Sequence, residues 1–344
     1  MNEAIIIEKG IFILAIFSLT MVMAMYSTLA ERKIAAWLQD RVGPNRAGKG
    51  GLLQPLADGL KLFSKEEFLP DTPNKFLFIV GPAISMSVAL MTSAVIPWGD
   101  RLHINGRDVI LQATDIDVAI LYIFGVLSCG VYGIMIGGWA SNNKFSLMGA
   151  MRAASQMISY EVAMGLSIIA LLMMTGTLSL REISAQQSGM NWNVFYQPVG
   201  FIIFLICSFA ETNRTPFDLA ECEAELIGGY HTEYSSMRMG FYLFAEYASM
   251  FISSTILAVL YFGGYNYPGM DWAEVNWGIN VANIIGMLAL FAKLCFFIFF
   301  FMWVRWTIPR FRYDQLMRLG WKILIPLAIA NIMITGICIL VFDS

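Results

Sequence analysis

The chain alternates between eight long apolar stretches and shorter segments in which polar and charged residues gather. About 20 apolar residues cross the hydrocarbon core of a bilayer as a helix, so each stretch predicts a membrane-spanning helix. Together the stretches predict an all-α polytopic membrane protein that forms a single membrane domain over residues 1–344. The predicted spans are 5–29, 76–97, 117–140, 156–176, 196–212, 240–263, 278–304 and 321–341.

The first connection contains a shorter apolar pattern of a different kind. Leu52, Leu53, Leu56, Leu60 and Phe63 have the spacing of one face of a helix. An amphipathic helix of this kind lies in the interface between lipid and water, and we expect that placement here.

Lys and Arg are distributed unevenly between the connections. The connections 30–75, 141–155, 213–239 and 305–320 hold sixteen of the 22 basic residues, whereas the others hold only Arg101, Arg107 and Arg181. Because basic loops stay on the cytoplasmic side, these four connections are predicted to be cytoplasmic and both termini periplasmic. The first apolar stretch lacks a small-residue cleavage site, so we expect it to be retained as a span.

Composition agrees with a membrane protein and excludes several other classes. Hydrophobic residues make up 58% of the chain and charged residues only 14%, with a mean hydropathy of +0.64. No basic stripe interleaves with aromatic residues, which excludes nucleic-acid binding. The five cysteines are widely spaced and there are only two histidines. We therefore expect no metal, flavin or other redox centre in this chain.

An acidic segment follows the fifth predicted span directly. Residues 211–233 hold six acids against a single base, Arg214. Acids are costly near a bilayer core, so a cluster joined to a span indicates a functional site. The six acids are Glu211, Asp218, Glu221, Glu223, Glu225 and Glu233.

The spacing inside this segment predicts a second helix that begins after Pro216. Asp218, Glu221 and Glu225 would then line one face of it, with Glu223 pointing elsewhere. Like charges held close together raise one another's pKa, so such a row could accept and pass protons. The alternative is an ordinary solvated helix face, which the apolar residues of the same segment disfavour.

Three further charges lie within predicted spans. Glu161 is near the start of the fourth span, Glu246 within the sixth, and Lys293 half-way along the seventh. A charge at the centre of a bilayer costs about 3 kcal/mol or more, so we expect all three to face the protein interior. A buried lysine lowers its pKa or finds a carboxylate. Snorkelling to the headgroups is the alternative, and it is easiest for Glu161.

The first connection also carries candidate polar groups. Glu31 ends the first span, and Asp58 and Lys61 are one helical turn apart, where they can pair. Residues 43–49 have the spacing of a phosphate-binding loop. However, Gly50 stands where Ser or Thr should bind magnesium, and no strand precedes the loop. We therefore do not expect a nucleotide site.

Short motifs occur along the chain in an order that resembles one known family, the H subunit of bacterial NADH:quinone oxidoreductase. This is a membrane component of respiratory complex I, and its mitochondrial counterpart is subunit 1. The similarity covers nearly the whole chain, and the run at 211–221 is the most specific. The motifs are ERK at 31–33, GPN at 43–45, LLQPLADGLKLFSKE at 52–66, SYE at 159–161, ETNRTPFDLAE at 211–221, ELIGGYHTEY at 225–234, AEY at 245–247 and PRFRYDQLM at 309–317.

The resemblance implies eight transmembrane helices in a bacterial inner membrane and cytoplasmic loops that meet the hydrophilic arm of the complex. It implies a quinone chamber with a lipid-side entrance, quinone as substrate, and an iron–sulfur cluster supplied by a neighbouring subunit. The partners implied are hydrophilic quinone-site subunits, small membrane-arm subunits and lipid. The quinone-site residues implied are Glu31, Arg32, Arg41, Asp58, Lys61, Glu66, Arg214 and Arg305. The proton-path residues implied are Glu161, Glu211, Asp218, Glu221, Glu223, Glu225, Glu233, Glu246 and Lys293, and Arg310 also matches a family position.

The functional hypothesis is that quinone reduction changes charge in a poorly screened chamber, and that the carboxylates respond by changing protonation or position. Three alternatives stand beside it. The related membrane component of an energy-converting hydrogenase shares the acidic loop, but the ETNR run and the long first connection disfavour it. A stand-alone ion transporter would show internal repeats, which are not visible. A purely structural anchor would need its carboxylates only for assembly.

Overall fold

The computed structural model describes residues 3–70, 74–104 and 107–342, and for residues 3–8, 104 and 223–224 it describes the backbone alone. Within these residues, seven helical segments are long and apolar enough to cross a membrane. The fifth predicted span, 196–212, is a shorter apolar helix, α8 (Pro198–Glu211), which α7 (Asn193–Tyr196) precedes. The long segments are α1 (Glu3–Leu38), α3 (Lys75–Ser93), α4 (Ala119–Ala140), α5 (Lys144–Thr175), α10 (Ser236–Tyr261), α12 (Ile279–Thr307) and a C-terminal segment of α13 (Tyr313–Arg318), the π-helical turn η3 (Leu319–Leu324) and α14 (Ile325–Phe342). The prediction of an all-α polytopic membrane protein is confirmed.

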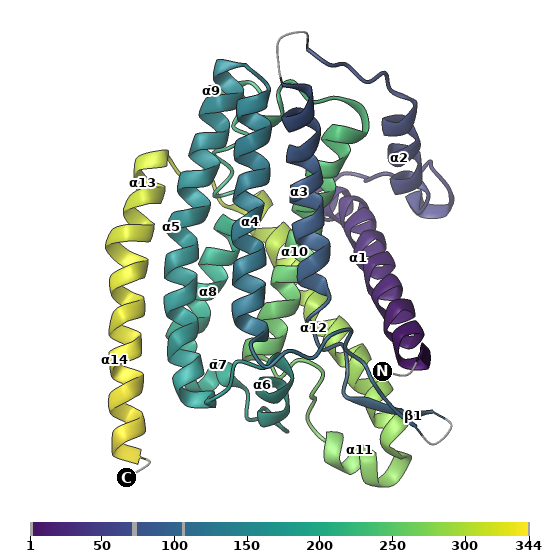
Figure 1. Cartoon of the computed structure of the whole chain (residues 1–344), viewed down its shortest axis with the longest axis vertical. Coiled ribbons are helices and arrows are strands. Elements are labelled where there is room, and N and C mark those ends of the chain that lie inside the picture. Colours follow the sequence, from purple (N-terminus) through teal and green to yellow (C-terminus); the bar gives the residue numbers. More distant parts are fainter. Residues whose placement is uncertain (1–2, 71–73, 105–106, 343–344) are drawn as a thin grey trace.

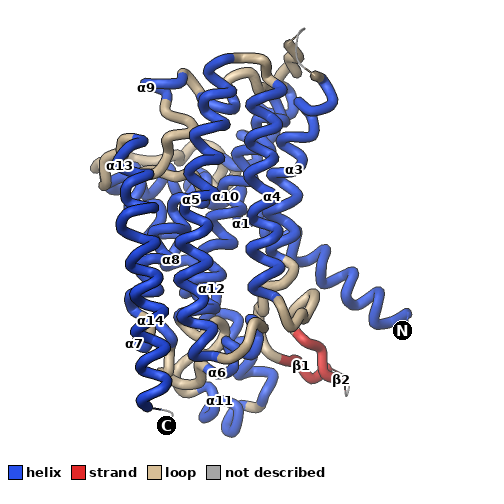
Figure 2. Tube along the Cα trace, turned by 60° about the vertical axis from the view of Figure 1, so that its left-hand side comes forward, coloured by secondary structure: helices blue, strands red, loops and turns tan. Residues whose placement is uncertain are grey.

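The helices stand side by side in one bundle, with α14 at one edge and α1 at the other (Figure 1). Helix α10 packs against α1, α3 and α12, while α5 packs against α4, α8 and α14. The N-terminal part of α1 slants away from the rest of the bundle (Figure 2). The helices α5, α8 and α10, which carry Glu161, Glu211 and Glu246, therefore lie in the middle of the bundle.

Several helices are longer than the apolar runs that predict them. Helix α1 continues to Leu38, beyond the predicted end at 29, and α5 begins at Lys144, ahead of the predicted start at 156. A helix satisfies its backbone hydrogen bonds whatever its side chains are, so it continues past the apolar stretch. As a result, most of the predicted connection 141–155 is helical.

The predicted amphipathic helix is present as α2 (Gln54–Ser64), after the short turn η1 (Lys49–Gly51). Pro55 lies in its first turn, where a missing N–H costs nothing. Its apolar side chains are not used in the core of this chain: Leu60 and Phe63 are 70% and 71% exposed. Such a face is suited to lipid or to a partner.

The opposite end of the bundle carries small elements that the sequence did not predict. Strands β1 (Arg101–Ile104) and β2 (Arg107–Ile110) form an antiparallel hairpin, close to α6 (Leu180–Gln186) and α11 (Met270–Trp277) (Figure 1). The Asn280 side chain accepts from the His103 backbone N–H at 2.7 Å and donates to its carbonyl at 2.9 Å. The hairpin is thereby fastened to the start of α12.

Helices α3 and α4 approach closely because glycines line their contact. The Tyr242 hydroxyl donates to the Gly133 carbonyl at 3.0 Å, and a Cβ added at Gly137 would overlap that hydroxyl. Tyr234 likewise donates to the Phe78 carbonyl at 3.0 Å. Two tyrosines thus bond to main-chain carbonyls of α3 and α4, and the Tyr242 hydroxyl occupies space that Gly137 leaves open.

Gly137→Ala is expected to destabilise the protein by about 1–3 kcal/mol, because the added methyl group displaces the Tyr242 hydroxyl. Gly125→Ala on the same helix is the matched control, since no atom lies within 4 Å of its added Cβ. Thermal unfolding in detergent would measure both. Equal stability of the two variants would contradict this packing.

Candidate functional site

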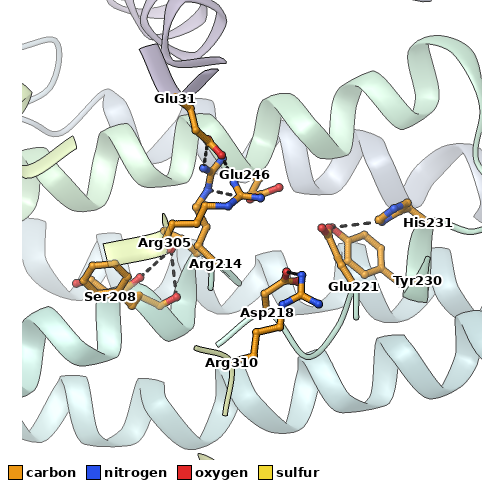
Figure 3. A network of polar contacts seen from close by, with 12 residues as sticks. Glu31, Ser208, Arg214, Asp218, Glu221, Tyr230, His231, Glu246, Arg305 and Arg310 are labelled. Atoms are coloured by element: carbon orange, nitrogen blue, oxygen red, sulfur yellow. Dashed lines mark hydrogen bonds and ion pairs between the residues drawn. The ribbon is translucent and has the colours of Figure 1, made fainter. Parts of the chain in front are cut away.

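Arg214 lies at the centre of a buried charge network (Figure 3). Its side chain is only 1% exposed, in the irregular segment that follows α8. Its Nη1 donates to Glu31 Oε2 of α1 at 2.5 Å, and its Nε lies 2.8 Å from Glu246 Oε1 of α10. The guanidinium carbon lies 4.1 Å from the ring centroid of Tyr247, a cation–π contact.

A second arginine completes the network. Arg305, near the end of α12, approaches the other oxygen of Glu31 at 2.6 Å. Two acids and two bases are therefore linked, and their formal charges cancel. Buried charges are tolerated when they are paired in this way, and removing one partner leaves an uncompensated charge. The network joins α1, α10, α12 and the segment after α8.

One cavity of about 340 Å³ lies on one side of this network, between α1, α2 and α10. Its charged lining residues are Arg32, Asp58 and Lys61, and Phe244 and Tyr247 are among its apolar and aromatic residues. Arg32 Nη1 lies 2.7 Å from Asp58 Oδ2. Asp58 therefore pairs with Arg32, whereas the sequence suggested Lys61 as its partner.

A second, smaller cavity of about 60 Å³ lies on the other side, among α3, α4, α5 and α10. Glu211 and Glu246 both line it, together with Tyr230 and Tyr242. One Glu211 oxygen, Oε2, is buried without a hydrogen-bond partner among the described residues. A polar space of this size can hold water. In the neighbouring helix, Glu161 accepts a hydrogen bond from Ser128 of α4.

The acidic segment does not form the predicted helix, so the expected row of carboxylates on one helix face is wrong. Residues 212–222 are irregular and contain a cis Thr215–Pro216 bond. Only α9 (Glu223–Leu226) and the turn η2 (Gly229–His231) follow before α10. Glu223 opens α9, and its side chain lies outside the described part of the structure.

Asp218 and Glu221 of this segment instead each face a partner of their own. Arg310 Nη2 donates to Asp218 Oδ2 at 2.8 Å. The Tyr230 hydroxyl donates to Glu221 at 2.9 Å, and His231 Nδ1 lies 3.5 Å from the same oxygen (Figure 3). Opposite charges and hydroxyl donors stabilise carboxylates, whereas a shared face would place like charges together. These partners explain why the segment is irregular.

The pKa values of this segment follow from those surroundings. Burial raises the pKa of Asp218 to about 6, and the charge of Glu221 adds to the effect while Arg310 opposes it. For Glu221, burial is outweighed by His231 and the Tyr230 hydroxyl, and its pKa is lowered. For His231, burial is outweighed by Glu221, and its pKa is raised. Asp218 can therefore exchange a proton close to neutral pH.

The remaining predicted residues lie away from the network. Arg41 and Glu66 are exposed, and Arg41 Nε donates to Gln39. Glu225 is 51% exposed and pairs with Arg152 at 2.5 Å. The others are Glu233, which accepts from Asn143 at 2.6 Å, and Lys293, which contacts main-chain carbonyls. Among the described residues, no group of His, Cys, Asp and Glu could hold a metal ion.

Sequence reasoning did not find the aromatic partners of the acids. Tyr230 and Tyr247 contact Glu221 and Arg214 respectively, yet the sequence analysis gave neither tyrosine a role. The sequence carried no clear signal for Tyr247, because successive residues of a helix do not face each other and its position after Glu246 does not predict a shared partner. His231 was considered only as a metal ligand, whereas it pairs with an acid ten residues earlier.

The fold and the site define a polytopic membrane protein with a paired charge network between two cavities. A family model described as NADH dehydrogenase matches residues 11–336. The chain is 82% identical to the H subunit of the NADH-quinone oxidoreductase of Flavobacterium psychrophilum, over 99% of this chain and all of the relative. The corresponding proteins of Cytophaga hutchinsonii and Leptospira biflexa are 65% and 47% identical, over 98% of this chain in both cases and over 98% and 96% of the relative. The chain belongs to this NADH dehydrogenase family, whose relatives are H subunits of NADH-quinone oxidoreductase. This confirms the resemblance drawn from the motifs, and it confirms that the chain is a subunit of an oxidoreductase complex.

Arg214→Met is expected to destabilise the protein by about 3–5 kcal/mol, because it leaves Glu31 and Glu246 with less buried positive charge. Arg152→Met removes an exposed pair and should cost at most about 1 kcal/mol. The amount of folded protein and its thermal stability in detergent would separate the two. Comparable losses in both variants would show that burial does not set the cost.

His231→Gln tests the pH dependence of its pair with Glu221. The stabilisation from the raised pKa of His231 is complete below its ordinary value of 6.5 and is lost as pH rises through the raised value. That from the lowered pKa of Glu221 is complete above 4.5 and is lost as pH falls through the lowered value. The loss of thermal stability in the variant should therefore be largest between pH 4.5 and 6.5.

At higher pH the difference between wild type and His231→Gln should shrink. His103→Gln is the control, because the His103 pair with Asp108 is on an exposed hairpin and should matter little. A His231→Gln difference that stays constant with pH would rule out the charged pair.

Proposed function

We propose that this chain is the membrane subunit of a proton-translocating NADH-quinone oxidoreductase that forms part of the quinone chamber and transmits quinone reduction to carboxylates. One observation carries the proposal. Glu246 and Tyr247 are consecutive on α10 and line different cavities, and Arg214 contacts both. A charge change in the larger cavity therefore acts on Arg214, which is paired with an acid of the smaller one.

The larger cavity has the properties that a quinone requires. Its volume of about 340 Å³ is within the usual range of small-molecule sites. Arg32 and Lys61 supply donors for a quinone carbonyl, and the apolar lining suits a ring and its hydrophobic tail. In this proposal Glu31, Asp58, Arg214 and Arg305 support the chamber. The exposed Arg41 and Glu66 would face the part of it that partner subunits complete.

Reduction of the quinone takes two electrons and two protons and yields a quinol. The electrons would come from a neighbouring subunit of the complex. Until the two protons are taken up, the added electrons leave negative charge in a poorly screened site, and this charge acts over long distances because the effective dielectric constant is low. In the resting state the two acids Glu31 and Glu246 and the two bases Arg214 and Arg305 carry no net charge together. The added charge would change how strongly Arg214 is held by each of its two carboxylates.

The proton path is proposed to run from the acidic segment through the smaller cavity. Asp218 and Glu221 would exchange protons at its cytoplasmic side. Glu246 and Glu211 face the shared cavity, where water could connect them. The outer acids Glu223, Glu225 and Glu233 and the helix acid Glu161 complete the proposed set. Coupling of this kind is a free energy shared between two sites, so it acts in both directions.

The partners and orientation follow from the same proposal. The relatives are named as components of NADH-quinone oxidoreductase, which favours the quinone-using branch over a hydrogenase or a stand-alone transporter. We expect hydrophilic quinone-site subunits at the end of the molecule that carries α2 and α9, small membrane-arm subunits alongside, and lipid around the rest. The termini would then lie on the periplasmic side of a bacterial inner membrane.

Glu246→Gln in the intact complex tests this function. We expect proton pumping coupled to NADH:quinone turnover to fall about tenfold or more, because the amide cannot pass a proton along the proposed path through the smaller cavity. Glu225→Gln should reduce pumping less, since that acid is exposed and held by Arg152.

Glu182→Gln is the matched control, because Glu182 lines a separate cavity at the hairpin end of the molecule. Pumping and turnover should be normal in that variant. Full pumping by an assembled Glu246→Gln complex would remove the charge network from the mechanism and leave it a structural role.

A further inference from the structure

Lys293 lies half-way along α12 and is held by the chain segment that follows α10. Its Nζ donates to three main-chain carbonyls, those of Phe262 at 2.7 Å, Gly264 at 2.8 Å and Asn266 at 2.5 Å. The ring centroid of Trp192 lies 5.2 Å from the same nitrogen. The contacts recorded for this ammonium in the described chain involve carbonyl oxygens and an aromatic ring, with no carboxylate.

The carbonyls at the C-terminal end of α10 need hydrogen-bond donors because that end is buried. Helix α10 ends in the protein interior, where Leu257 to Tyr261 are fully or almost fully buried. Its last carbonyls have no partners within the helix and cannot be hydrated freely. Side chains from other elements supply some of the donors. Gln187 bonds the Val259 carbonyl at 3.0 Å, Asn193 that of Leu260 at 2.8 Å, and Ser184 that of Gly263 at 2.9 Å.

The carbonyls of residues 262, 264 and 266 are left for Lys293. Gly263 and Gly264 have φ values of 74° and 55°, which side-chain-bearing residues rarely adopt. This backbone turns alternate carbonyls toward one point. Three acceptors match the three protons of an ammonium group, whereas a neutral amine would leave one carbonyl unmatched. The negative end of the α10 dipole also favours a cation there.

We infer that residues 262–266 form a carbonyl cage for a monovalent cation, and that Lys293 is its built-in occupant. The cage selects a primary ammonium group, because three hydrogen bonds converge on it and Trp192 covers another side. Unwound backbone and helix C-termini bind alkali cations in the same way in transporters. Lys293 therefore holds a fixed charge that closes the buried end of α10. It does not pass protons along the acidic path in which the sequence placed it.

The cage can be tested by emptying it and refilling it. Lys293→Ala removes the three terminal methylenes and the ammonium, which together correspond to n-propylammonium. A cavity of about 470 Å³ at the hairpin end is lined in part by Tyr265 and Asn266, and we expect a small cation to enter the emptied cage from that side. We expect the purified intact complex carrying Lys293→Ala to dissociate several degrees below wild type, and n-propylammonium chloride to recover part of that shift.

The controls isolate the cation. Neutral 1-propanol and tetramethylammonium, which lacks N–H donors, should not stabilise the variant. Lys9→Ala should lose little and show no rescue, because among the described residues Lys9 donates to a single carbonyl, that of Gln112. Stability of Lys293→Ala equal to wild type, or equal rescue by 1-propanol, would overturn the cage.

If Lys293→Ala does not assemble, Lys293→Arg and Lys293→Met decide the matter. The arginine variant keeps charged donors and should assemble with a stability below wild type but above that of the methionine variant, which is of similar length and has no donors. Equal stability of these two variants would refute the cage. So would a methionine variant that is fully stable yet fails to pump protons, since that result assigns Lys293 to proton transfer.

Discussion

The pairing of Arg214 with Glu31 and Glu246 is the interaction on which the rest of this structure depends. The Arg214 guanidinium is 1% exposed, and a buried charge of this kind is stable only when it is paired with carboxylates. Glu31 of α1 and Glu246 of α10 supply them. Arg305 then approaches Glu31 from α12. Helices α1, α10 and α12 are thereby held around the irregular segment that follows α8. The two cavities lie on either side of this network.

The molecule satisfies its buried polar groups in two different ways. Toward the end that carries α2 and α9, ion pairs cancel the charges of Glu31 and Arg214, so the network is neutral but sensitive to any added charge. Near the buried end of α10, main-chain carbonyls meet amide, hydroxyl and ammonium donors, among them Lys293. The first arrangement can respond to a charge, because one proton unbalances it. In the second arrangement the side-chain donors of Gln187, Ser184 and Lys293 already have carbonyl acceptors, so they are less free to respond.

Much of the fold could be predicted from hydrophobic patterning, because the length of an apolar run indicates whether it can span a membrane. Helix α2 was recognised by its periodicity for the same reason. The row of Asp218, Glu221 and Glu225 was wrong because spacing along a sequence carries no information about distant partners. Arg310, His231 and Arg152 each take one of these acids out of the row. The hairpin at 101–110 was missed because two four-residue strands give too short a pattern.

Glu246 and Tyr247 are adjacent on α10, and successive residues of an α-helix point about 100° apart. The helix itself is therefore the wall between the two cavities, and its register decides which side chain faces which. An insertion or deletion of a single residue between Ser236 and Glu246 would turn the acid out of the smaller cavity while leaving the helix intact. The number of residues in this half of α10 therefore cannot change by even one. A count of apolar residues along the chain does not reveal this constraint.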